Sequence, residues 1–175
     1  MKIRLLTLAV LGVLALSAPL AGQKRDPLND VESDQLREVA QEPYKRLKLL
    51  IKFATERLDT VEAVQKDDKT SRRGQKMHDA LEDFRQIVDE LDDNIDDYVQ
   101  KQSDLRRGLN EVISAEQGFD SRLKAMKEHA QDPKNADEYK LYSFVMQDAI
   151  ESVNLSLDDA KKTLEEQTTA LGKKK

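Results

Sequence analysis

The densest group of potential ligands in this sequence lies between residues 89 and 97, where six of nine residues carry a carboxylate. On a helix, side chains three and four positions apart lie on one face. Asp89, Asp93, Asp96 and Asp97 therefore predict a weak site for a hard divalent cation, Ca²⁺ or Mg²⁺, because such ions prefer oxygen ligands. The competing interpretation is a solvated acidic face that attracts a basic neighbouring helix. We expect no other cofactor.

The remaining reactive side chains do not form a known catalytic pattern. The chain has no cysteine, which removes disulfides, thiolate metal sites and thiol nucleophiles. His78 and His129 do not stand in the Glu-x-x-His pairs that di-iron bundles use. Neither a Gly-x-Ser-x-Gly turn nor a glycine-rich phosphate loop occurs. The sequence therefore predicts a protein that is not an enzyme.

A seam of side chains recurs every 3.5 residues through the middle of the chain. Steps of four and three alternate, which keeps one side of a helix turned toward a partner helix. Only Gln102 and Glu116 break the apolar rule. A polar seam residue either fixes the register or lies where cover is thin, and we expect thin cover for Glu116 because a carboxylate resists burial. The seam positions are Met77, Leu81, Phe84, Val88, Leu91, Ile95, Tyr98, Gln102, Leu105, Leu109, Val112, Glu116, Phe119, Leu123, Met126 and Ala130.

This periodicity predicts an all-α fold with one helical domain at residues 29–172. Its helices span about 29–66, 71–131 and 135–171. Pro43 marks either a kink in the first helix or the start of a new one, because proline removes a backbone donor but is tolerated in a first turn, and we expect the kink. The unbroken register favours a central helix about 90 Å long, at 1.5 Å per residue. With antiparallel neighbours it forms an elongated three-helix coiled-coil-like bundle. The alternative is a compact four-helix bundle with a turn near residues 102–104, where the seam is least apolar.

The first two predicted helices carry complementary charge. Residues 43–58 hold five basic side chains and one acidic one, and residues 79–97 hold nine acidic side chains and one basic one. An antiparallel hairpin closed at residues 67–70 brings these segments side by side. Lys48 and Asp92 are the pair that we expect to meet, in an exposed contact worth about 0.2–1 kcal/mol.

The N-terminal segment has the pattern of a secretory signal peptide. A basic start precedes an apolar run at residues 5–16 and a small-residue exit, which predicts cleavage after Ala21 or Gly22. The run is shorter than the roughly 20 residues that a membrane-spanning helix needs. We therefore expect an exported protein, periplasmic or secreted. We assign residues 1–22 to the signal peptide, 23–28 to a flexible arm and 173–175 to a basic tail.

The charge balance restricts the class of partner. The formal net charge is −5, which disfavours nucleic acid because surfaces that bind it are basic. Lys173 to Lys175 predict no more than a weak contact with an anionic surface. We expect a non-enzymatic helical interaction protein, a scaffold or a holdase-like chaperone. It binds other proteins or a second copy of itself through its rod surface, as a monomer or homodimer. The alternative function is weak divalent-cation binding by the acidic cluster.

Overall fold

The structure, a computed structural model, describes residues 26–67 and 69–172. Within these residues every regular element is helical, so the predicted all-α class is confirmed. The helices are α1 (Asp30–Glu38), α2 (Pro43–Lys66), α3 (Arg73–Gln100), α4 (Arg106–Ala130), the short 3₁₀ helix η1 (Pro133–Asn135), α5 (Ala136–Tyr139) and α6 (Ser143–Gly172).

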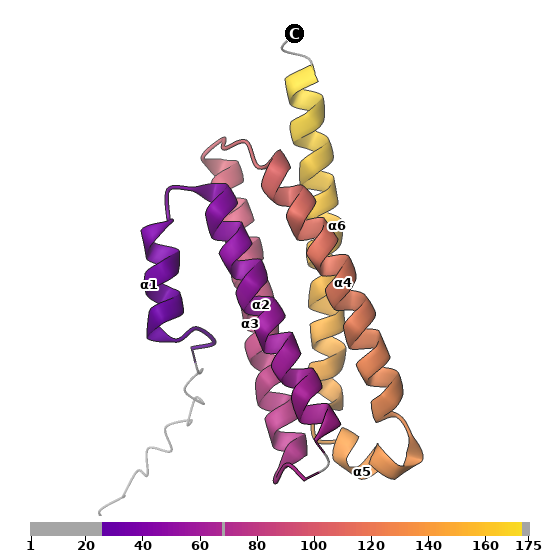
Figure 1. Ribbon diagram of the computed structural model, residues 1–175. Helices are drawn as coiled ribbons and strands as arrows, with labels where there is room; N and C mark the ends of the chain where they lie inside the picture. The colour runs from indigo at the N-terminus through magenta and orange to yellow at the C-terminus, as the bar shows by residue number, and fades with distance from the viewer. Residues whose placement is uncertain (1–25, 68, 173–175) are drawn as a thin grey trace, which may run out of the picture.

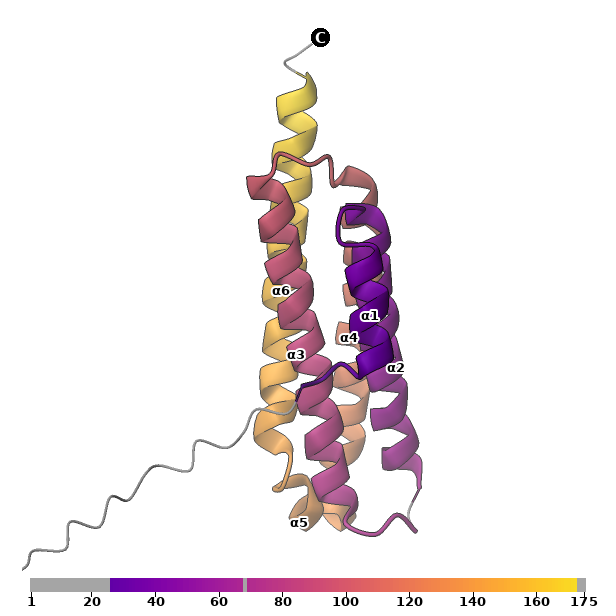
Figure 2. The ribbon, with the colours of Figure 1, turned by 90° about the vertical axis from the view of Figure 1, so that its left-hand side faces the viewer.

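Four long helices pack around one apolar core. Helix α2 lies against α3 and α4, and α6 lies against the same two helices (Figures 1 and 2). Every apolar position of the predicted seam is buried, because α3 and α4 both turn that stripe inward. At the centre, the rings of Phe84 on α3 and Phe119 on α4 meet edge to face, with centroids 5.4 Å apart.

The continuous central helix is wrong, and the turn of the alternative architecture is present. Helix α3 ends at Gln100 and α4 begins at Arg106. Gln102 has φ of 57°, in the left-handed region that normally favours glycine. The Gln102 amide donates to the Val99 carbonyl at 2.9 Å and the Ser103 amide donates to the Tyr98 carbonyl at 3.0 Å. These are the two hydrogen bonds of a Schellman helix end.

Helix α6 holds this turn in place. The Leu105 amide donates to Oε1 of Gln167 at 2.9 Å, and Nε2 of Gln167 donates to the Ser103 carbonyl at 3.0 Å. One side chain therefore satisfies a donor and an acceptor of the turn. Figure 2 shows α6 continuing past the turn between α3 and α4.

The first predicted helix is two helices, so a kink at Pro43 is also wrong. Helix α1 ends at Glu38 and runs antiparallel beside α2 (Figure 1). Asn29 and Glu32 form a capping box at the start of α1, with bonds of 3.0 and 2.9 Å. Glu32 also pairs with Arg57 of α2 at 2.6 Å. Pro43 occupies the first turn of α2, where its missing amide hydrogen costs nothing.

Two glycines of α4 differ in what surrounds them, and this yields a matched prediction. A Cβ on Gly118 would meet nothing within 4 Å, whereas on Gly108 it would lie 2.9 Å from Cδ1 of the buried Leu47. We expect Gly118→Ala to raise the free energy of unfolding by about 0.5–1 kcal/mol through helix propensity. Gly108→Ala is expected to lower it by about 1 kcal/mol, because overpacking outweighs that gain. Thermal unfolding of both variants checks this, and equal shifts would contradict the close approach of α2 to α4.

The predicted signal peptide and basic tail lie outside the described residues, as does the arm up to residue 25. Across residues 26–67 and 69–172, no helix has the length and apolar character to cross a membrane.

Candidate functional site

The most unusual group of side chains in the bundle is a carboxyl–hydroxyl–carboxyl cluster, formed by Asp92 of α3, Glu116 of α4 and Ser156 of α6. The Ser156 hydroxyl lies within hydrogen-bond distance of Oδ1 of Asp92 and of Oε1 of Glu116. Glu116 has no exposed surface and Ser156 has 1 %. Oε2 of Glu116 has no hydrogen-bond partner.

This geometry requires a proton on one of the two carboxyl groups. A serine hydroxyl has one hydrogen to donate and lone pairs that accept. If both carboxyl groups were ionised, the Ser156 hydroxyl could donate to only one of them. The other carboxylate would then face the hydroxyl oxygen of Ser156 with no hydrogen between the two oxygens. Both contacts of Ser156 are hydrogen bonds when one carboxyl donates to Ser156 and Ser156 donates to the other.

The environment decides that Glu116 holds the proton. Burial, with a smaller contribution from the charge of Asp92, raises its pKa from 4.5 to about 8 against the opposing effects of Ser156 and Lys161. Burial also raises the pKa of Asp92 from 3.8 to about 6, with contributions from Asp89, Asp159 and Asp96 against the hydrogen bond of Ser156. Near neutral pH, Glu116 is therefore neutral and Asp92 is mainly ionised.

The expectation of thin cover at Glu116 is wrong. Its seam position directs it into the core between Val112 and Phe119, one turn away on each side and both buried. A charged glutamate would not be stable there. The missing signal was Ser156, a polar residue within the otherwise apolar buried stripe of α6, which supplies the hydroxyl across 40 residues of sequence.

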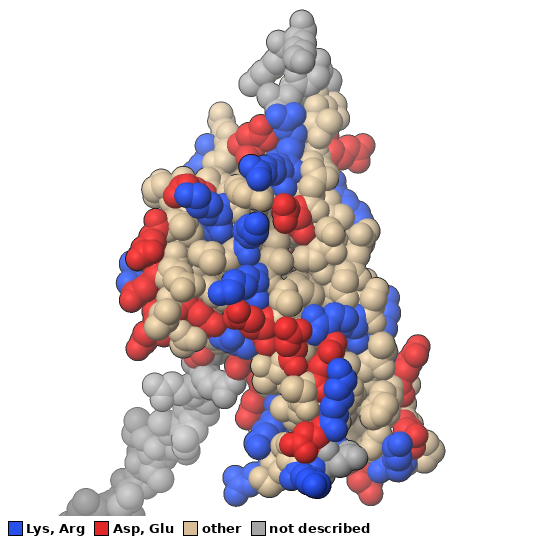
Figure 3. All heavy atoms as spheres, in the orientation of Figure 1, with Lys and Arg blue, Asp and Glu red and all other residues tan. Residues whose placement is uncertain are grey.

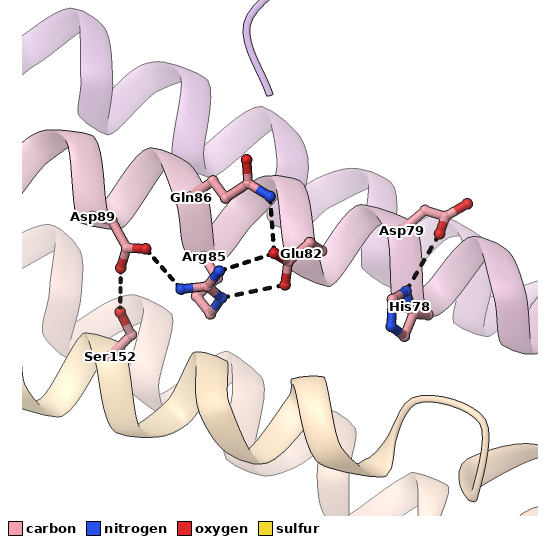
Figure 4. A network of polar contacts seen from close by, with 7 residues as sticks. All are labelled: His78, Asp79, Glu82, Arg85, Gln86, Asp89 and Ser152. Carbon is pink, nitrogen blue, oxygen red and sulfur yellow. Dashed lines mark hydrogen bonds and ion pairs between the residues drawn. The ribbon is translucent and has the colours of Figure 1, made fainter. Parts of the chain in front are cut away.

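A second polar network continues along α3 toward α6 (Figure 4). Arg85 contacts Glu82 at 2.9 Å and Asp89 at 2.7 Å, and the Ser152 hydroxyl donates to Asp89 at 3.0 Å. The hydrogen bond to Glu82 raises the pKa of Arg85, as do the charges of Asp89, Glu82 and Asp148. Arg85 is the only basic residue among the nine acids of residues 79–97, so it neutralises only part of this helix.

The four residues of the predicted cation site do not converge. Asp89 is engaged by Arg85 and Ser152, whereas Asp93, Asp96 and Asp97 are exposed. In the part of the chain that the structure describes, no group of three or more His, Asp or Glu side chains is placed to hold a metal ion. The His78 side chain contacts the neighbouring Asp79 carboxylate at 3.3 Å. Cation binding by this segment stays a prediction, for which calorimetric titration with Ca²⁺ and Mg²⁺ is the measurement.

The predicted charge pairing of α2 with α3 rests on a different residue. Arg46 contacts Glu90 at 3.4 Å and donates to Asn94 and, at 2.7 Å, to the Leu36 carbonyl. The expected meeting of Lys48 with Asp92 is wrong. Asp92 faces Ser156 of α6, and the Lys48 ammonium lies 6.0 Å from the centre of the Tyr44 ring. Most of the acidic charge of α3 is therefore not matched by α2.

Solvent reaches a groove of about 690 Å³ between the C-terminal parts of α2 and α4, lined in part by Glu62, Arg122 and His129. Two of its charged groups pair, since Arg122 contacts Glu62 at 2.7 Å, and Arg122 also contacts Asp59 of α2 at 2.5 Å. The hydrogen bond from Arg122 lowers the pKa of Glu62. The groove therefore lacks a carboxyl group held ready to release or accept a proton near neutral pH.

Comparison with known proteins adds nothing to this geometry. No family model, curated protein or solved structure matches the chain.

The surface shows a separation of charge and of apolar side chains. Figure 3 shows Lys and Arg side chains gathered over the middle of the face that α2 and α4 present. Exposed basic residues of these helices include Lys45, Lys48, Lys52 and Arg107. Among the residues whose side chains the structure describes, the large apolar side chains that are exposed lie elsewhere. They are Val31 (65 %), Val99 (39 %), Leu141 (63 %), Phe144 (80 %) and Leu155 (61 %).

Proposed function

We propose that this chain is an exported, non-enzymatic helical interaction protein, of the scaffold or holdase-like type, that binds other proteins through the outer face of α6. The observation that carries the proposal is Phe144, a phenylalanine with 80 % of its surface exposed on a helix whose other face is buried. The sequence predicted binding through the surface of an elongated rod. Because the prediction of that rod is wrong, we place the binding surface on this face of α6.

Phe144 contributes little to the fold. A phenylalanine gains about 1.5–3 kcal/mol when it is fully buried, and Phe144 realises only a small part of that gain within the chain. Leu155 lies eleven residues further, close to three full helical turns, so it projects from the same side of α6. Single exposed apolar residues are ordinary, but two on one helix face support a role in binding.

The other parts of the proposal rest on separate observations. Export is supported by the pattern of residues 1–22. A non-enzymatic role is supported by the position of the carboxyl groups whose pKa is raised, Asp92 and Glu116, which lie between the helices and do not line the groove.

Photo-crosslinking in the producing cell tests the proposal. A photoreactive phenylalanine analogue replaces Phe144, Leu155 or, as a matched control, Val31 of α1, whose exposure lies between those of the other two. We expect protein adducts from positions 144 and 155, because those side chains contact the partner, and few from position 31. A small number of defined adducts indicates a scaffold, and a broad distribution indicates a holdase.

Equal adduct yields from all three positions, or none from positions 144 and 155, would refute binding through α6. Since all three side chains are largely solvent-exposed, the replacements are expected to leave the melting temperature unchanged, which circular dichroism checks.

A further inference from the structure

The exposed apolar stripe of α6 lies among acidic side chains. Phe144 and Leu155 are separated along the helix axis by about 16 Å, at 1.5 Å per residue. Asp148 and Glu151 follow Phe144 at steps of four and seven, and Asp158 and Asp159 follow Leu155 at steps of three and four. These spacings place the carboxylates beside the stripe. A partner that covers both apolar side chains must also accommodate this negative charge.

Helix α3 adds to the same acidic surface. Ser152 and Ser156 of α6 bond to Asp89 and Asp92 of α3, which joins the two helices along their length. Asp159 of α6 acts together with Asp89 and Asp96 to raise the pKa of Asp92. Carboxylates from both helices are therefore close enough to repel one another along this junction.

Much of this negative charge is unpaired. Within the described residues, no hydrogen bond or ion pair engages the carboxylates of Asp93, Asp96, Asp97, Glu151 or Asp159. The basic residues of α2 do not reach them, because Lys45 pairs with Glu42 and Lys52 with Glu56 in their own segment. The attraction between α2 and α3 therefore does not account for the acidic surface.

From this combination we infer that the outer face of α6, together with the acidic edge of α3, docks a lysine- or arginine-rich amphipathic helix of a partner protein. The inference rests on the proposed function and adds the chemistry of the partner. Apolar side chains of the docked helix cover Phe144 and Leu155, and its cations pair with the carboxylates between and beside them. The long-range attraction also accelerates encounter at low salt.

A second copy of the chain fits this surface less well. Its basic residues on α2 and α4 supply positive charge, but the large exposed apolar side chains of the described residues all lie outside those two helices. The basic face therefore offers no apolar side chain to cover Phe144. An amphipathic helix of another protein supplies both the positive charge and the apolar side chains.

Two labelled peptides of about 20 residues test the inference, one with leucines at a and d positions and lysines elsewhere, the other with glutamates replacing the lysines. Fluorescence anisotropy with the folded chain is expected to show saturable binding of the lysine peptide and at least about tenfold weaker binding of the glutamate peptide, a difference of about 1.4 kcal/mol. Raising the salt concentration from about 50 to about 300 mM is expected to weaken binding of the lysine peptide by about tenfold.

Variants locate the binding. Two double variants are each expected to weaken binding of the lysine peptide by about tenfold. One combines Phe144→Ser with Leu155→Ser, and the other combines Glu151→Gln with Asp159→Asn. Val31→Ser is the matched control and is expected to change nothing. Because the substituted residues are exposed or without ion pairs, each variant is expected to melt like the parent.

Several outcomes overturn the inference, and they separate it from the proposed function. Equal binding of both peptides, or no effect of the acidic substitutions, removes the cationic partner, while α6 adducts in the crosslinking experiment would still support protein binding. Saturable self-association in sedimentation, abolished by Lys48→Glu, replaces the foreign helix with a second copy. Failure of both peptides together with an absence of α6 adducts rejects the proposed function as well.

Discussion

Raising the pH from about 5 to about 9 is expected to lower the free energy of unfolding by roughly 4 kcal/mol, because Glu116 must then ionise inside the bundle. Its pKa is about 8 in the folded protein and 4.5 for an ordinary glutamate. Between these values the folded chain holds a proton that the unfolded chain has released. The contribution of Glu116 to stability is therefore largest at a pH of 4.5 or below, and it is lost as the pH rises through about 8.

Asp92 contributes in the same direction over a lower range, since its pKa is raised from 3.8 to about 6. Carboxylates whose pKa is lowered by a basic partner, such as Glu62 and Glu82, act oppositely and destabilise the fold when they are protonated in acid. We therefore expect maximum stability in mildly acidic solution. Guanidinium unfolding at pH 5, 7 and 9 measures the curve.

Glu116→Gln isolates the effect of the buried carboxyl. A glutamine amide donates to Ser156 as the protonated carboxyl does, so the variant is expected to match the parent at about pH 5 and to exceed its stability at about pH 9 by roughly 4 kcal/mol. A pH dependence that is the same in the parent and in Glu116→Gln would show that another group carries it. Asp97→Asn, at an exposed acid of α3, is the control.

Truncation of the central aromatic pair is expected to be the most damaging single change. Phe84 has no exposed surface, and Phe84→Ala is expected to lower the free energy of unfolding by about 3–5 kcal/mol through lost burial and a cavity. Because that is a large part of a typical domain stability, Phe84→Leu serves as a milder variant that stays folded. Denaturant unfolding of both variants gives the values.

The same pair tests the turn between α3 and α4. In the four-helix arrangement the two rings touch, so a double-mutant cycle of Phe84→Leu and Phe119→Leu is expected to give a coupling of about 0.5–1.5 kcal/mol. In a continuous helix, 35 residues at 1.5 Å each would separate them by about 52 Å, with no coupling. A coupling of zero would reject the turn at Gln102.

The core could be read from the sequence because apolar periodicity reports directly on which side of a helix is buried. Every apolar position of the seam from Met77 to Ala130 is buried. The same periodicity concealed the turn. Tyr98 and Leu105 are seven residues apart, as they would be in a continuous heptad, and both are buried on either side of the reversal. The left-handed position is held by Gln102, where a glycine would have marked the helix end.

Less of the candidate site than of the core could be predicted from apolar periodicity. The position of Glu116 in the seam was visible, but whether a carboxyl is tolerated there depends on which polar group faces it from another helix. Ser156 supplies that group from 40 residues away. The acidic segment was visible too, yet its pairing with α2 could not be foreseen residue by residue, since helix rotation decides whether Arg46 or Lys48 faces α3.

The contacts that α6 makes with the turn and with the buried carboxyls have a consequence for the order of folding. Asp92, Glu116 and the turn at residues 101–105 precede α6 in the chain, but their hydrogen-bond partners Ser156 and Gln167 lie on α6. Until α6 packs against α3 and α4, the turn lacks its side-chain clamp and both carboxyls lack the hydroxyl that they share. Docking of α6 is therefore the step that fixes the earlier helices in their final arrangement.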